Sequence, residues 1–264
     1  MLGPVELRAR TGESVPVGGA RLRTLLTLLA LDANRVVSAD RLIDGVWGGE
    51  PPAAAANALQ ALVSRLRRTA PELDVEVAAN GYRLVIDADA VDAHRFVRLA
   101  PTQPGLALTL WRGELDFPEV ARADAVRLAE LRLAAVKAHL RAETDGRDTV
   151  PELEGLVAAH PLDEQLAALL MRALRAAGNP GRALGVFESV RRRLADQLGA
   201  DPSAELAALH LEVLRAGERA SERAAERAGG KAAQERPAQQ PARNNLPAEM
   251  SSFVGRDSDV RTVR

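Results

Sequence analysis

Hydrophobic and polar positions follow two different patterns along the chain, and the change between them divides it. Up to residue 91, short stretches of alternating character flank stretches with helical spacing, whereas residues 92–216 have almost entirely helical spacing. Alternation with a period of two is typical of strands, while apolar residues at i, i+3, i+4 and i+7 indicate a buried helix face. The pattern therefore predicts a mixed domain over residues 1–91 and an all-α domain over residues 92–216.

The mixed part predicts a hairpin, three helices and a second hairpin. "VELRAR" and "SVPV" form the first hairpin. The first helix, over residues 21–31, has an apolar face of Leu22, Leu25, Leu26 and Leu29. Ser38 is a good N-cap for the second helix, and "EPPAAAANALQALVSRLRRTA" begins a third with prolines near its first turn. "VEVAANGYRLVI" alternates around Asn80-Gly81, a strong hairpin signal.

Six helices are expected in the second part, over residues 92–99, 120–143, 150–160, 162–177, 182–198 and 203–216. Glycine and proline lie between them, which indicates antiparallel helix pairs and a loose tetratricopeptide-like array. The stretch "ALTLWRGELDF" does not fit this repeat. Residues 217–245 have almost no large apolar side chain and predict a disordered linker, although their early charge repeat could extend a helix as a solvated shaft.

The third helix has one apolar and one polar side. On a helical wheel the apolar side consists of Leu59, Leu62, Val63 and Leu66. The polar side consists of Asn57, Gln60, Ser64, Arg65 and Arg68, with no acid between Asn57 and Arg68. Amide, hydroxyl and guanidinium groups read base edges and bind phosphates. A solvated face in an arginine-rich protein is the alternative, and the helix alone does not decide between them.

The order of the elements favours DNA binding. Three helices with a basic third one, followed by a hairpin, are the order of a winged helix-turn-helix, in which the third helix enters the major groove. Arg67 lies near the apolar side and is expected to reach outward to a phosphate. Tyr82 and Arg83 follow the hairpin turn and are expected to contact the backbone or the minor groove. The net charge is only −1, so DNA binding must come from this local patch.

Other kinds of chemistry find little support in the sequence. The chain has no cysteine, which excludes disulfides and thiolate catalysis. Metal-ligand spacing is absent from its four histidines, His94, His139, His160 and His210. No acid/base pair or activated nucleophile is recognisable, and "GGKAA" lacks the remainder of a phosphate loop. We therefore expect neither an enzyme nor a cofactor or metal site. Without a signal pattern or a membrane-length apolar run, a cytoplasmic, nucleoid-associated protein is expected.

Four stretches of the chain carry a resemblance to a known family: "GGARLRTLLTLLALDANRVVSADRLIDGVWGGEPPAAAANALQALVSRLRR", "NGYRL", "LWRGELDF" and "HPLDEQLAALLMRALRAAGNPGRALGVFESVRRRLADQLGADPSAELAALHLEVL". Together they resemble the Streptomyces antibiotic regulatory protein family. The resemblance covers about residues 2–216. It implies an OmpR-type winged helix followed by a bacterial transcriptional activation domain. Such activators bind promoter direct repeats near the −35 element, often as a side-by-side pair, and recruit RNA polymerase holoenzyme through its sigma factor.

The resemblance also assigns roles to residues. It places the recognition helix on Asn57, Gln60, Ser64, Arg65 and Arg68, a phosphate contact on Arg67, and the wing on Tyr82 and Arg83. The alanine-rich start "PPAAAANAL" departs from the more polar start expected of the family, so thymine-methyl contacts or DNA shape are expected to contribute there. An adaptor that does not bind DNA, and a repressor with the same fold, remain alternatives.

Three further expectations concern the tryptophans and the tail. Trp111 is expected to pack the activation domain against the winged helix, whereas Trp47 either contacts the DNA backbone or packs in the core. Residues 246–264, "LPAEMSSFVGRDSDVRTVR", resemble the entry to the nucleotide-binding domain of larger family members. We therefore expect the chain to be truncated before that domain, so that any ATP site would lie in the missing part.

Overall fold

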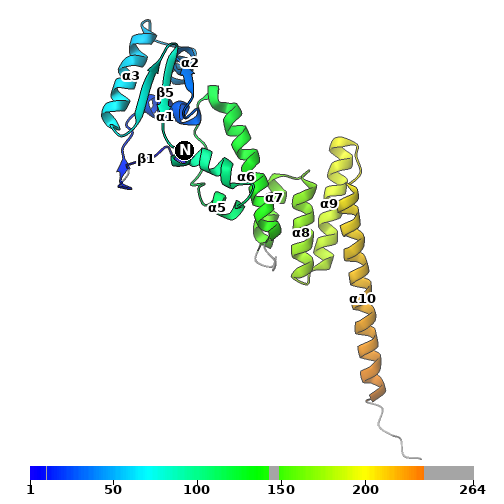
Figure 1. The fold of residues 1–264 in the computed structure, drawn as a ribbon. Helices are drawn as coiled ribbons and strands as arrows, with labels where there is room; N and C mark the ends of the chain where they lie inside the picture. The colour runs from blue at the N-terminus through cyan, green and yellow to red at the C-terminus, as the bar shows by residue number, and fades with distance from the viewer. Residues whose placement is uncertain (10, 143–148, 235–264) are drawn as a thin grey trace, which may run out of the picture. The chain divides into compact units, whose positions relative to one another are not determined.

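The computed structural model describes residues 1–9, 11–142 and 149–234 (Figure 1). The chain divides into two compact units, residues 1–214 and residues 215–264. The expectations for residues 235–264, which include the end of the linker and the start of a nucleotide-binding domain, lie outside the described residues. No helix in the described part is long and apolar enough to cross a membrane.

The expected hairpin, three helices and second hairpin are all present. They are β1 (Leu7–Arg8), β2 (Ser14–Val15), α1 (Ala20–Leu31), α2 (Ala39–Trp47), α3 (Ala55–Thr69), β4 (Asp74–Ala78) and β5 (Gly81–Val85). Ser38 caps α2 as predicted, because its hydroxyl accepts a hydrogen bond from the Arg41 N–H at 3.3 Å. Pro51 and Pro52 lie near the first turn of α3 as expected, just before the helix begins at Ala55.

A strand that the sequence did not predict completes the wing sheet. β3 (Val36–Ser38) pairs antiparallel with β5, and the sheet order is β3-β5-β4. Gly81 is essential to this arrangement, since a Cβ atom there would lie 1.9 Å from the Val37 carbonyl oxygen. Ala78 pairs with Gly81, so the turn residues are Ala79 and Asn80, and neither has a positive φ. The Asn-Gly pair thus predicted the hairpin correctly, but the glycine is needed for the close approach of β3.

One hydrophobic core extends from Met1 to Ala135 and joins the winged helix to the helices that follow it. Those helices are α4 (Asp92–Leu99), α5 (Pro104–Leu108), a 3-10 turn, η2 (Glu119–Ala121), and α6 (Arg122–Ala142). The predicted apolar face of α1 is buried in this core. Trp111 packs against it, with its ring edge-on to Phe96 at 5.5 Å between centroids. Trp111 is thus a packing residue of the first core, but its ring contacts, Phe96 and Arg132, both lie within residues 92–216, so its expected contact with the winged helix stays a prediction. α5 accounts for part of the stretch that the helical repeat left unassigned.

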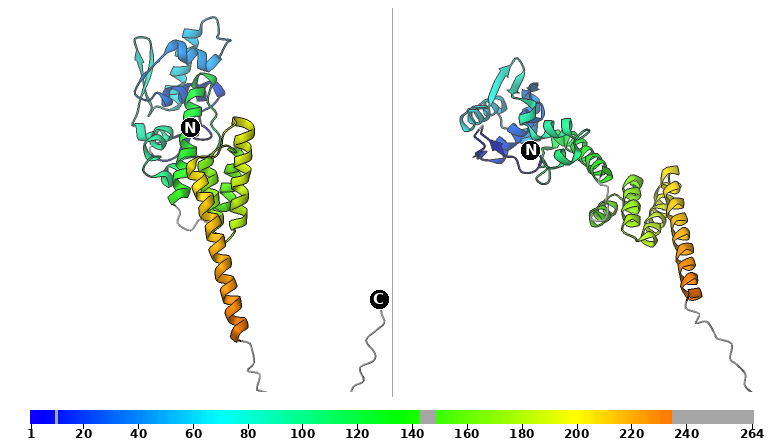
Figure 2. Two further views of the ribbon diagram at one scale, coloured as in Figure 1. Left: turned by 90° about the vertical axis from the view of Figure 1, so that its right-hand side faces the viewer. Right: turned by 60° about the horizontal axis from the view of Figure 1, so that its bottom comes forward.

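A second core gathers the remaining helices of the first unit. They are α7 (Val150–Ala159), α8 (Glu164–Ala176), α9 (Pro180–Leu198) and the first part of α10 (Ala204–Gln234). Figures 1 and 2 show α7, α8 and α9 as successive antiparallel helices side by side. Phe187 of α9 stacks on His210 of α10, with ring centroids 3.9 Å apart. The fold class is as predicted, a winged helix-turn-helix followed by a helical array.

α10 is longer than the sequence predicted. It continues to Gln234, so the first part of the interval expected to be a disordered linker is helical. Its charge repeat, Glu218, Arg219, Glu222 and Arg223, is the feature that allowed such a shaft. Among the described residues no cluster of histidines and carboxylates could hold a metal ion.

Candidate nucleic-acid interface

Tertiary packing holds α3 with its polar side outward. Leu59, Val63 and Leu66 are at most 1% exposed and anchor the helix on the core, and Leu62 is partly buried beside them. These are the four residues that the helical wheel placed on the apolar side. The basic residues Arg67 and Arg68 lie in the last turn of α3, where positive charge complements the helix dipole.

Five of the predicted recognition-helix residues share the exposed side of α3. They are Asn57, Gln60, Ser64, Arg65 and Arg68. Arg65 Nη2 donates to the Gly18 carbonyl at 3.3 Å, and Arg68 Nε donates to the Ser64 carbonyl at 3.4 Å. Neither guanidinium lies within 4.0 Å of a carboxylate of the described residues. Their charge is therefore available to an anionic partner.

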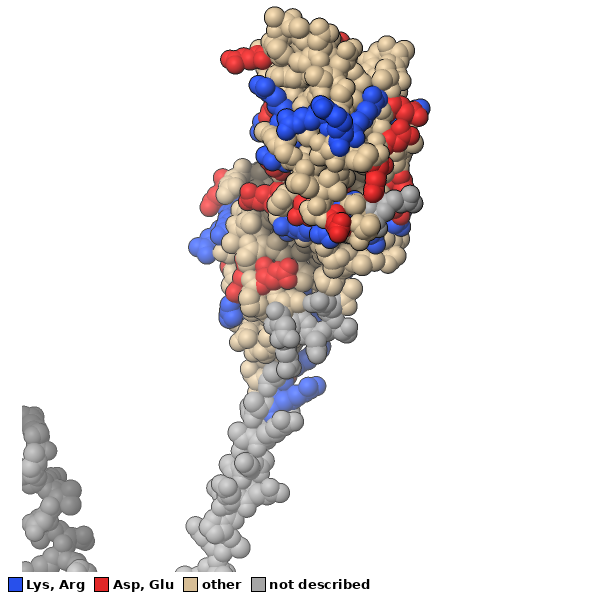
Figure 3. All heavy atoms as spheres, turned by 90° about the vertical axis from the view of Figure 1, so that its left-hand side faces the viewer, with Lys and Arg blue, Asp and Glu red and all other residues tan. Residues whose placement is uncertain are grey.

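The same side of the molecule has a continuous basic zone. Figure 3 faces the side where α3 lies and shows basic side chains gathered in a band across the winged-helix part, with acidic ones toward its edges. The Arg65 hydrogen bond to Gly18 brings the turn before α1 beside α3. Arg21 and Arg23 follow in the first turns of α1, and both are exposed. Local spacing did not single out this pair, although "ARLR" is a basic stretch without an acid.

Arg67 differs from Arg65 and Arg68 because its guanidinium is bound to the backbone of β4. Its Nε donates to the Val75 carbonyl at 3.0 Å, and its Nη2 donates to the same oxygen, so the guanidinium joins α3 to β4. Nη1 has no hydrogen-bond partner among the described residues. The sequence indicated that this side chain must reach outward from the core edge, but its structural partner could not be read from spacing.

The two wing residues already have contacts within the protein, although only Tyr82 is buried. Tyr82 is 8% exposed and belongs to the core, opposite Val37 and Val77 in the sheet register. Arg83 Nε donates to Glu76 Oε2 at 3.1 Å, and both side chains are a little over 40% exposed. The most exposed large apolar side chain of the wing sheet is that of Val77, which is 70% exposed and which sequence reasoning missed; Val36 and Val85 are less exposed.

Trp47 adopts the core alternative of the two that the sequence left open. It is partly buried and packs against the first core, with the Arg21 guanidinium over its ring at 6.0 Å. Such a cation–π contact stabilises the packing of the start of α1 against the end of α2. Two of the histidines have structural contacts: His94 Nε2 lies 2.9 Å from the Ala30 carbonyl oxygen, and His210 stacks on Phe187.

Comparisons with known proteins agree with this arrangement. The family described as "Transcriptional regulatory protein, C terminal" matches residues 16–84, and the "Bacterial transcriptional activator domain" matches residues 73–214. The chain is 36% identical over 285 residues to the regulatory protein AfsR of Streptomyces coelicolor, covering 100% of this chain and 28% of AfsR. It is 35% identical over 251 residues to the regulatory protein DnrI of Streptomyces peucetius, covering 82% of this chain and 91% of DnrI.

A solved structure has the same architecture. EmbR of Mycobacterium tuberculosis, solved in complex with a low-affinity phosphopeptide, is similar with a TM-score of 0.70 and 31% sequence identity. The similarity covers 81% of this chain and 64% of that chain. Taken with the two matching domain families, these relatives show that the chain belongs to the Streptomyces antibiotic regulatory protein family of DNA-binding transcriptional activators.

Proposed function

We propose that the chain is a sequence-specific activator that binds direct repeats near the −35 element of promoters for secondary-metabolite genes. Bound there as a side-by-side pair, it recruits RNA polymerase holoenzyme through its sigma factor. The observation that supports this proposal most is the exposed side of α3. There Arg65 and Arg68 are free of carboxylates, beside amide and hydroxyl groups, on the third helix of a winged helix.

The groups on α3 divide by the chemistry that they offer to DNA. The amides of Asn57 and Gln60 match adenine in the major groove, and Arg65 and Arg68 match the two acceptors of guanine. Arg67 offers a phosphate its unoccupied Nη1 while its other nitrogens bind Val75. The alanines before Asn57 offer methyl contacts, so specificity there rests on thymine methyls or DNA shape.

The wing contributes less direct chemistry in this proposal. Arg83 reaches the DNA backbone with its charge partly neutralised by Glu76, and the Tyr82 ring supports the hairpin from the core side. Apolar groups in minor-groove proteins contact the sugar edges or wedge between bases, and the exposed Val77 is suited to the first of these roles. The helical array then holds neighbouring protomers or contacts polymerase.

Footprinting on the promoter beside its own gene tests the proposal. We expect protection of two direct repeats whose centres are about one helical turn, 10–11 bp, apart. The Arg65/Arg67/Arg68→Ala triple variant should lose specific binding, whereas a matched Arg35/Arg191/Arg192→Ala variant should retain it. A folded α3 triple variant with unchanged promoter affinity would contradict the assignment.

Transcription in vitro separates the activator from the two alternatives. With holoenzyme and a weak −35 promoter, the chain should raise transcript output in proportion to occupancy of the repeats. Lower output would identify a repressor with the same fold. Failure to find any salt-dependent DNA binding would favour an adaptor, because phosphate contacts make affinity fall as salt rises.

A further inference from the structure

A cavity of about 920 Å³ is lined by the winged helix and by the start of the helical part, and none of the five exposed polar residues of α3 lines it. Its walls come from segments far apart in the sequence: residues 5–9 around β1, α1, the turn after α3, the end of β5, and α4. Pockets for small molecules typically enclose about 300–1,000 Å³, so this one is large enough for such a ligand.

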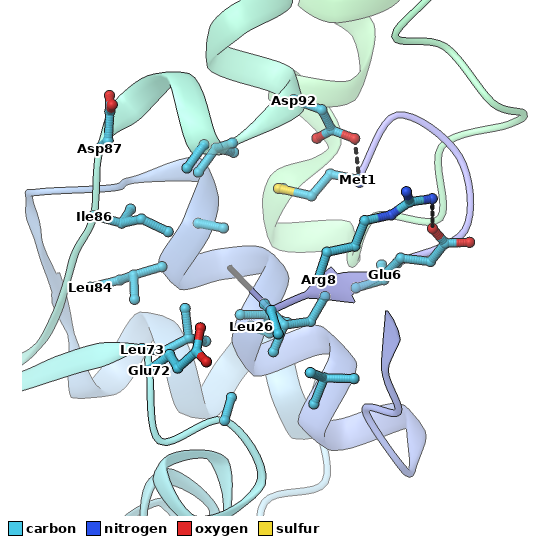
Figure 4. Close-up of a pocket in the computed structure, with 18 of the residues that line it drawn as sticks. Met1, Glu6, Arg8, Leu26, Glu72, Leu73, Leu84, Ile86, Asp87 and Asp92 are labelled. Carbon is cyan, nitrogen blue, oxygen red and sulfur yellow. Dashed lines mark hydrogen bonds and ion pairs between the residues drawn. The ribbon is translucent and has the colours of Figure 1, made fainter. Parts of the chain in front are cut away.

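The inner wall of the cavity is apolar. Leu26, Ala30 and Leu84 line it and are themselves at most 6% exposed, so the cavity reaches the domain core. Figure 4 shows Leu26, Leu73 and Leu84 on this wall, while Glu6, Arg8 and Asp92 lie on another side. An apolar wall of this kind stabilises a ligand by removing its hydrocarbon surface from water.

Ion pairs already neutralise one side of the mouth. Arg112 binds Glu6 and also Asp92, whose Oδ2 lies 2.7 Å from the Met1 ammonium. The Arg112 guanidinium lowers the pKa of Glu6. Burial alone would raise the pKa of Asp92, but hydrogen bonds and charge from Met1, Leu2 and Arg112 lower it overall. These carboxylates are therefore ionised and engaged, and they do not require a cationic ligand.

Arg95 differs from the other cations of the mouth. It is exposed on α4, lines the cavity, and its guanidinium makes no hydrogen bond to a described residue. Asp89, whose pKa the Arg95 charge helps to lower, is already bound by Arg98 through both oxygens, at 2.8 and 2.6 Å. A guanidinium with unengaged donors beside an apolar wall matches a carboxylate with a hydrocarbon body.

We propose that this cavity binds a small molecule with an apolar body and a single anionic group, with the body against Leu26 and Leu84 and the anion on Arg95. Asp87 also lines the mouth, and its negative charge disfavours a ligand with a second anionic group. The ligand would contact Thr69 and Ala70 at the end of α3 as well as α4. Its binding is independent of the proposed DNA-binding function and is measured without DNA.

Decanoate, with 1-decanol as its neutral counterpart, tests the proposal on the full chain. The probe is 1-anilinonaphthalene-8-sulfonate, whose fluorescence should rise to saturation and fall when either ligand displaces it. Arg95→Gln should weaken decanoate binding about 10- to 100-fold, the usual contribution of a charge-assisted hydrogen bond, and leave 1-decanol unchanged. Arg35→Gln, which removes an exposed arginine that does not line the cavity, should leave both ligands unchanged.

A second variant tests the cavity itself. Thr109 lines the mouth at an exposed position, so Thr109→Trp fills part of the space without entering the core, and both ligands should bind more weakly. The proposal is overturned if the folded wild-type chain shows no saturable binding, if Arg95→Gln and Arg35→Gln act equally, or if Thr109→Trp binds as the wild type. A ligand-free dimer that Thr109→Trp dissociates, with no decanoate binding, would identify a second copy as the occupant and also overturn it.

Discussion

Arginine has different surroundings in the two halves of the candidate DNA interface. On α3, Arg65 and Arg68 bind only backbone carbonyls among the described residues, and their charge faces outward. On the wing, Arg83 is bound to Glu76 across the hairpin, and its neighbour Tyr82 is buried. A polar or aromatic residue near a turn is therefore not by itself a DNA contact, because the residue opposite it in the sheet decides whether its groups are already engaged.

Substitution of Tyr82 should have the largest effect, and this effect should be on the stability of the fold and not on DNA affinity. Tyr82→Ala removes a ring that is 8% exposed and should lower the free energy of unfolding by about 3–5 kcal/mol, measured by urea denaturation. Tyr82→Phe keeps the ring and should leave stability and DNA affinity nearly unchanged. A clear loss of DNA affinity in folded Tyr82→Phe would instead support the phosphate contact expected from the sequence.

Substitution of Arg65 or Arg68 should instead lower DNA affinity and leave the stability of the fold nearly unchanged. Arg65→Ala or Arg68→Ala should weaken specific DNA binding by about 1–3 kcal/mol if the side chain makes a bidentate contact to guanine. Because both residues are exposed, the free energy of unfolding should change by less than about 0.5 kcal/mol. Gel-shift titrations measure the affinity, with Arg35→Ala as the control for loss of one positive charge.

Arg67 should affect both properties because it joins the two halves. Arg67→Ala removes the hydrogen bonds to the Val75 carbonyl and should cost about 0.5–1.5 kcal/mol of stability. It should also lower the slope of log DNA affinity against log salt concentration by about one unit, because one phosphate contact is lost. Arg67→Lys keeps the charge but not the planar fork. If Arg67→Lys kept the wild-type stability as well as the salt dependence, the planar fork would not be needed to join α3 to β4.

Glu76 should give the smallest effect. The Arg83–Glu76 pair is more than 40% exposed on both sides, so Glu76→Gln should change stability by less than about 1 kcal/mol. It leaves the Arg83 charge unneutralised, and DNA affinity should rise at low salt and return to the wild-type value as salt increases. Glu188→Gln, which breaks the exposed pair with Arg191 on α9, controls for net charge. Equal effects of the two variants would remove Arg83 from the interface.

The sequence predicted the helices better than the sheet contacts. The faces of α1 and α3 followed from local spacing, because a helix repeats every 3.6 residues and its buried side is visible within two turns. β3 was missed because three residues are too few to show a period, and its pairing depends on β5, more than forty residues later. For the same reason the need for glycine at position 81 follows from the Val37 carbonyl and not from the turn.

The domain boundary expected at residue 91 stays a prediction, but the extent of the first core shows what local patterns do not contain. The change from mixed to helical spacing occurs there, yet the first core continues through Phe96 and Leu128 to Ala135. Hydrophobic burial depends on which surfaces meet in space, and a change of secondary-structure pattern does not mark where a core ends. The cavity beside Arg95 is also made by segments that meet only after folding.

By itself, the sequence determined the order of the elements, the apolar faces of the helices and the acid-free polar side of α3. These properties depend on residues close together in the chain. The tertiary structure alone decided which side chains already have partners: Arg67 on Val75, Arg83 on Glu76, Tyr82 in the core. A side chain's availability depends on atoms brought to it from distant parts of the chain, and local spacing contains no record of them.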